Sequence, residues 1–137
     1  MFKYNTLQEV FDKVYETVTV KGMTSRNLNA RGCSSYIHNP NGCFIGMLLP
    51  SEVAERLEKT VYEVRIYIIN RILAHPEYVV FAEVAQYFSN LSDKEIDALA
   101  DLQAMHDLDA PTNWKQHLIT FAIKHGLTIP NYGVENV

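Results

Sequence analysis

Cys33 and Cys43, which flank His38, are the side chains best able to form a covalent bridge or hold a metal. Two runs of β-forming residues surround the turn at 39–42, so we expect a hairpin over about residues 33–49. In a regular hairpin Cys33 faces Leu48, which places the two thiols about 16 Å apart, too far for a disulfide. A nine-residue gap with one histidine is also a weak zinc pattern. We therefore expect two buried thiols, with no metal and no cofactor.

The five histidines contain no H-x-x-x-H or H-E-x-x-H pair. His106 precedes Asp107, an arrangement that can orient a general base. No nucleophile partner is visible, so a solvated helix end is the preferred interpretation. No P-loop, dinucleotide fingerprint or nucleophile elbow is present either. We expect no catalytic residue and lean against an enzyme, with a metal-dependent enzyme using a cysteine or histidine kept as an alternative.

The polar segment 23–38 is a candidate binding loop. It carries Arg26, Asn29 and Arg31, followed by Tyr36 and His38. Loops on rigid scaffolds often carry binding groups, and the planar fork of arginine suits a carboxylate or phosphate. An ordinary solvated loop explains the same residues equally well. A small-molecule or nucleotide site at this loop is the resulting hypothesis.

The charges are unevenly distributed along the chain. Residues 1–75 hold nine Lys/Arg against seven Asp/Glu, while residues 76–137 hold three against nine, so the net charge of -4 comes from the second half. Asp93, Asp97 and Asp101 recur every four residues and predict an acidic stripe on one helix face, either for a basic partner or simply solvated. The second half cannot supply a basic phosphate-binding surface, so nucleic acid is not an expected partner.

The elements that would position these residues are mainly helical. Capping boxes at Thr6/Glu9, Thr60/Glu63 and Ser92/Glu95 indicate helix starts. We expect one domain over residues 1–137 of the α+β class, mainly α, with five or six helices around one short hairpin. The expected helices run from 7 to Gly22, from 51 to about 58, from 60 to about 74, from Pro76 to about 88, from 92 to about 107 and from 112 to 125. The segment 61–74 also has strand-like alternation, and its length favours helix.

Several short motifs resemble those of a group of small uncharacterised bacteriophage and prophage proteins. They are Cys33-x-x-Tyr36, Gly42-Cys43-x-x-Gly46-x-Leu48-x-Pro50, and Leu102-Gln103-x-x-His106-Asp107 with Trp114 downstream. A Leu-Gln-x-x-Phe-Asp segment at 7–12 adds to the likeness, and residues 60–90 depart from it. The resemblance implies a phage context in the bacterial cytoplasm and supplies no catalytic residue.

The leading functional hypothesis is a non-enzymatic accessory protein that binds a host protein. It depends on the missing catalytic motifs together with the acidic half and the arginine-bearing loop. No apolar run reaches the roughly 18 residues of a membrane helix and no secretory signal is visible, so we expect a soluble, cytoplasmic protein without membrane contact. Its oligomeric state is unknown from these patterns.

Overall fold

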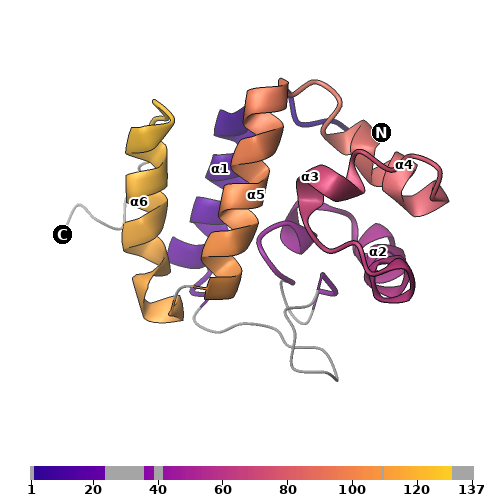
Figure 1. The fold of residues 1–137 in the computed structure, drawn as a ribbon. Helices are drawn as coiled ribbons and strands as arrows, with labels where there is room; N and C mark the ends of the chain where they lie inside the picture. The colour runs from indigo at the N-terminus through magenta and orange to yellow at the C-terminus, as the bar shows by residue number, and fades with distance from the viewer. Residues whose placement is uncertain (1, 24–35, 39–41, 109, 131–137) are drawn as a thin grey trace.

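The computed structural model describes residues 2–23, 36–38, 42–108 and 110–130. Within them the chain forms six α-helices and two 3₁₀ helices and contains no strand (Figure 1). In chain order the elements are α1 (Leu7–Thr19), η1 (Gly46–Leu48), α2 (Ser51–Val64), α3 (Ile69–Ile72), α4 (Val79–Tyr87), α5 (Asp93–Leu108), η2 (Pro111–Asn113) and α6 (Trp114–Lys124).

The helices fall into two neighbouring groups (Figure 1). α1, α5 and α6 lie side by side, and α2, α3 and α4 lie together beside them. α3 packs on α5 and so joins the groups, while η1 contacts both α1 and α2. The buried apolar side chains form one cluster to which all six α-helices contribute, with Phe44, Phe11 and Trp114 among its largest fully buried members.

The predicted local signals at the ends of three helices are confirmed. Thr6 accepts a hydrogen bond from the Glu9 amide at the start of α1, while the Glu9 carboxylate accepts from the Asn5 amide and not from the Thr6 amide that a capping box predicts. Ser92 and Glu95 bond each other's amides at the start of α5, as a capping box requires. After α6 the chain turns at Gly126, where φ is +67°, and the Leu127 amide donates to the carbonyl of Ala122, which is the Schellman pattern.

The predicted β-hairpin is wrong for the described residues. Residues 42–49 form a tight turn and η1, closed by the hydrogen bond from the Met47 amide to the Cys43 carbonyl. All eight of these residues are buried, so the run lacks the alternation of a half-exposed strand. Such a continuous apolar run fits an irregular core segment as well as it fits a strand. The fold is therefore all-helical in its described part and not α+β.

The predicted boundary between helices at 58–60 is also wrong. α2 continues through Thr60 because Val53, Leu57, Val61 and Val64 extend one apolar stripe beyond the apparent capping box. The helix ends instead at Arg65, and only Ile69–Ile72 of the expected 60–74 helix forms a separate element.

The helix expected to begin at Pro76 begins three residues later, at Val79. Residues 76–78 form a turn in which the Tyr78 amide donates to the His75 carbonyl. The predicted inward positions Phe81, Val84 and Phe88 are buried. None of the helices in the described ranges has the length and apolar character needed to cross a membrane.

Candidate functional site

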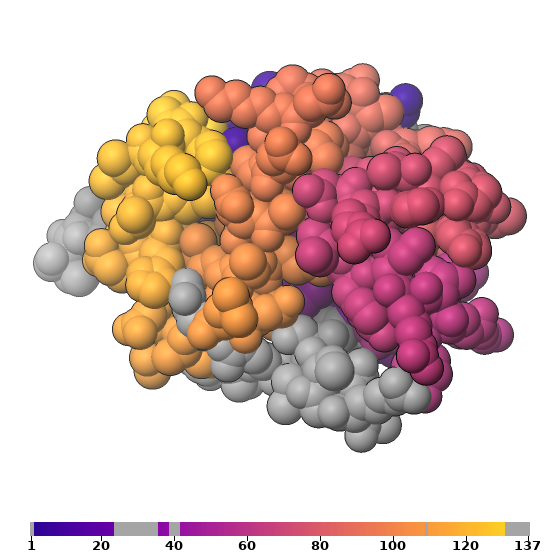
Figure 2. Space-filling view, in the orientation of Figure 1, coloured from indigo at the N-terminus to yellow at the C-terminus, as the bar shows by residue number. Residues whose placement is uncertain are grey.

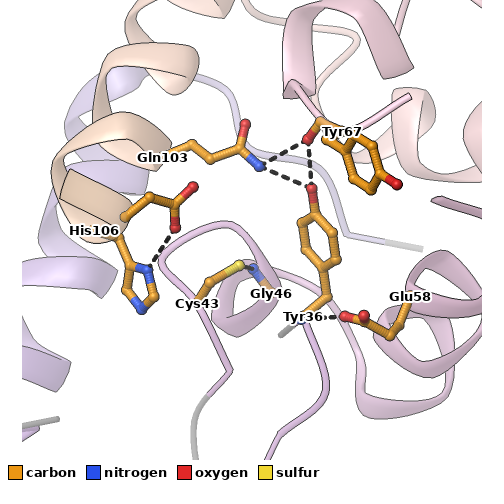
Figure 3. A network of polar contacts seen from close by, with 8 residues as sticks. Tyr36, Cys43, Gly46, Glu58, Tyr67, Gln103 and His106 are labelled. Carbon is orange, nitrogen blue, oxygen red and sulfur yellow. Dashed lines mark hydrogen bonds and ion pairs between the residues drawn. The ribbon is translucent and has the colours of Figure 1, made fainter. Parts of the chain in front are cut away.

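A polar network lies at the junction between α3, α5 and the segment before η1 (Figure 3). Gln103 on α5 donates through Nε2 to the hydroxyl of Tyr36 at 2.8 Å and to the carbonyl of Tyr67 at 3.0 Å. The Tyr36 hydroxyl donates to the same Tyr67 carbonyl at 2.9 Å. The amide of Ile69 completes the network by donating to Gln103 Oε1 at 2.9 Å. Every hydrogen-bonding group of the Gln103 amide is thereby engaged.

Tyr36, predicted as a contact residue of an exposed loop, is instead a centre of this buried network. It is 5% exposed, and its amide donates to Glu58 Oε1 at 2.8 Å. Its main chain lies directly against Gly42 and Gly46. A Cβ added at Gly42 would lie 2.6 Å from the carbonyl oxygen of Tyr36, and one added at Gly46 would lie 2.8 Å from the Cα of Tyr36. Burial, followed by the nearby Cys43, raises the pKa of Tyr36 well above its usual range, so the phenol stays protonated and donates.

Cys43 lies beside the network as a packed thiol (Figure 3). It is 3% exposed, and the Gly46 amide donates to its sulfur at 3.3 Å. Burial raises the pKa of the thiol to about 12, which removes the thiolate needed for nucleophilic or metal chemistry near neutrality. The prediction of a buried thiol is confirmed for Cys43. Cys33 lies outside the described residues, and the hairpin geometry that separated it from Cys43 no longer applies.

His106 does not lie on a solvated helix end, as predicted, but is fully buried. Its ring stacks on Trp114 with centroids 5.0 Å apart and meets Phe44 edge-on at the same distance. Its Nδ1 lies 3.0 Å from the carboxylate of Asp107, which is half exposed. The position follows from helical spacing, since His106 lies four residues after the buried Leu102. That signal was present in the sequence.

Of the other predicted binding residues, the structure describes only His38. His38 is half-buried, with Nε2 2.7 Å from the Gly46 carbonyl. Arg26, Asn29 and Arg31 lie outside the described residues. Of the proposed loop site, therefore, the structure places only Tyr36 and His38, and both contact the core segment that contains η1.

The acidic stripe lies exposed along α5, as its spacing predicts. Asp93, Asp97 and Asp101 all face solvent, and Asp101 lies 3.9 Å from Lys124 of α6. These two charges flank a shallow groove of about 240 Å³ between α5 and α6 (Figure 2). Its lining is formed by Asp101, Met105, His117, Thr120, Phe121 and Lys124.

The sequence patterns missed an exposed apolar segment between α2 and α3, which we call the α2–α3 turn (residues 65–68). Arg65 adopts a left-handed conformation with φ of 60° and ends α2. Tyr67 and Ile68 then project into solvent, 52% and 49% exposed. The exposed turn was missed because its apolar residues also fit the apolar face of the helix predicted from 60 to about 74.

The main chain of this turn is held by the buried network. The carbonyl of Tyr67 accepts two hydrogen bonds, and the amide of Ile69 donates to Gln103. The two exposed side chains thus lie on a backbone fixed from the inside. Tyr62, in the last turns of α2, is 48% exposed.

The fold and the site define a small helical protein with a buried polar network that supports an exposed aromatic turn. The described part of the chain gathers no group of three His, Cys, Asp or Glu side chains able to hold a metal ion. No family model, curated protein or solved structure matches the chain.

Proposed function

We propose that the protein is a non-enzymatic interaction protein that binds a protein partner through the α2–α3 turn. The observation that carries this proposal is the exposure of Tyr67 and Ile68 on a main chain that the interior holds in place. Association costs free energy for every group that must be ordered. A turn that is already ordered avoids the backbone part of this cost.

The chemically capable side chains of the described interior support a binding role over a catalytic one. The Tyr36 hydroxyl and the Gln103 amide are engaged in hydrogen bonds with each other and with the chain. The Cys43 thiol stays protonated near neutral pH because it is buried. These groups build a scaffold, and the groups available to a partner lie on the surface.

The bacterial cytoplasm and a phage context belong to the same proposal. The motifs that resemble those of small phage proteins meet in one place, where Tyr36, Cys43, Gln103 and His106 lie within the same buried region (Figure 3). Shared scaffold positions of this kind leave the surface free to differ between proteins, as partner binding requires.

The test is affinity capture of interacting proteins from bacterial lysate with the full chain as bait, followed by size-exclusion chromatography of the purified pair. We expect a defined partner that co-elutes in fixed stoichiometry. Repeated recovery of no such partner from several lysates, with folded bait, would contradict the proposal.

A further inference from the structure

We infer that the α2–α3 turn binds an acidic protein surface whose centre is apolar, with Tyr67 and Ile68 entering the apolar centre and Arg65 and Arg71 pairing with carboxylates at its edge. This inference rests on the proposed function and specifies the chemistry of the partner.

The apolar part of the argument comes from geometry. Tyr67 and Ile68 are consecutive residues on the short stretch between the left-handed Arg65 and the first turn of α3. About half of each side chain is exposed. The surface of α2 and α3 (magenta to rose) lies at the right of the face shown in Figure 2. Tyrosine is enriched at the centres of protein interfaces because it buries a large area with few rotatable bonds.

The charged part comes from the arginines. Arg56 pairs with Glu83 at 2.6 Å, whereas the side chains of Arg65 and Arg71 have no carboxylate partner among the described residues. Both are exposed, and in the sequence they stand on either side of Tyr67 and Ile68. An unpaired guanidinium presents a planar fork that matches a carboxylate in two hydrogen bonds. A partner surface bearing Asp or Glu around an apolar centre complements this pattern.

An acidic protein fits these features better than a nucleic acid does. The chain has a net charge of -4 and an exposed acidic stripe on α5, which at long range repel a densely charged phosphate backbone more strongly than a protein surface that carries a few carboxylates. Ile68 also offers no ring on which a base can stack. Two arginines beside an aliphatic and an aromatic side chain suit short-range pairing within a protein interface.

The test uses a displayed library of random peptides, selected on the full chain and counter-selected on the Tyr67→Ala/Ile68→Ala variant. We expect the selected peptides to combine Asp or Glu with aromatic or aliphatic residues. Their affinity should fall about tenfold or more in the double variant and in Arg71→Glu, and should weaken as salt is added. Val79→Ala and Lys115→Glu, which change exposed residues on other elements, are matched controls with no expected effect.

The variants are expected to fold, because the network contacts only the main chain of the turn. An unchanged urea midpoint checks this. Basic or uncharged peptides, no enriched peptide at all, or binding of a single-stranded oligonucleotide that the same variants abolish would overturn the inference. If a captured partner binds the wild type but not the double variant, while the selected peptides are basic or uncharged, the inferred chemistry of the partner is wrong and the proposed function stands. If a captured partner binds the wild type and the double variant equally, the α2–α3 turn is not the binding surface and the proposed function fails too. If no partner is captured, the function itself fails.

Discussion

The buried network around Gln103 makes a quantitative prediction about stability. Replacing Gln103 by Met keeps the length of the side chain and removes three hydrogen bonds, to Tyr36, Tyr67 and Ile69. Each such bond contributes about 1 kcal/mol net, and the Ile69 amide loses its buried acceptor. We expect Gln103→Met to lower the free energy of unfolding by about 3 kcal/mol. Tyr36→Phe removes two of the network's bonds and should cost about 2 kcal/mol.

The double variant tests whether these residues act as one unit. The hydrogen bond between Gln103 and Tyr36 is lost in both single variants, so it is counted twice when their costs are added. The double variant should therefore cost about 4 kcal/mol, roughly 1 kcal/mol less than the sum.

Urea unfolding followed by far-ultraviolet circular dichroism measures all four proteins. The midpoint should shift while the slope with denaturant stays constant. A cost below about 1 kcal/mol for Gln103→Met, or strictly additive costs in the double variant, would refute the reasoning.

Four further perturbations follow from the structure. Gly46→Ala places a Cβ 2.8 Å from the Tyr36 Cα and should cost about 3 kcal/mol, measured by urea unfolding. Arg65→Gly relieves the left-handed conformation and should stabilise by about 0.5–1 kcal/mol in the same assay; a loss would contradict the strain. Hydrogen bonds from backbone amides lower the pKa of Glu95, so the stability that its carboxylate contributes is present above about pH 4.5 and lost as the pH falls. Glu95→Gln should cost about 1 kcal/mol at pH 7 and should make Tm depend less on acid pH than it does in the wild type. Burial, followed by the charge of Lys124, lowers the pKa of His125, so the stability contributed by the neutral imidazole is present above pH 6.5 and lost below it. Between pH 7 and pH 5 the Tm of the wild type should therefore fall more than the Tm of His125→Gln. Parallel curves of Tm against pH would contradict this.

The parts of the fold that the sequence predicts correctly are those decided by neighbouring residues. The capping box of Ser92 and Glu95 and the turn at Gly126 each close within six residues, so a short window contains all the relevant groups. One hydrogen bond of Glu95 joins residues far apart in the sequence and could not be predicted from such a short window. Glu95 also accepts from the Leu7 amide at 2.8 Å and so links the starts of α1 and α5. No local pattern distinguishes a glutamate that caps one helix from one that caps two.

In the candidate site, too, the features set by neighbouring residues could be predicted, and those set by distant residues could not. Helical spacing was enough to bury His106, yet the neighbouring Asp107 favoured a surface interpretation. The position of Tyr36 could not be predicted, because its hydroxyl finds partners 31 and 67 residues further along the chain. The sequence predicts the contact surface at the polar loop and places Tyr67 in the middle of a helix, whereas the structure exposes Tyr67 on a turn.

The segment 60–74 explains why the polar network matters to the fold as well as to stability. Its apolar spacing and β-branched residues are compatible with a long helix or a strand, and its length favours the helix, so local preference does not choose the observed turn. Gln103 favours the observed turn, because the Tyr67 carbonyl and the Ile69 amide form hydrogen bonds with its side chain and not with an adjacent helical turn. A buried polar group with every bond made favours one arrangement over its competitors, because each alternative leaves that group unsatisfied. The same hydrogen bonds that interrupt the helix therefore set Tyr67 and Ile68 on the surface, and a change in the core at Gln103 should alter partner binding without touching the interface.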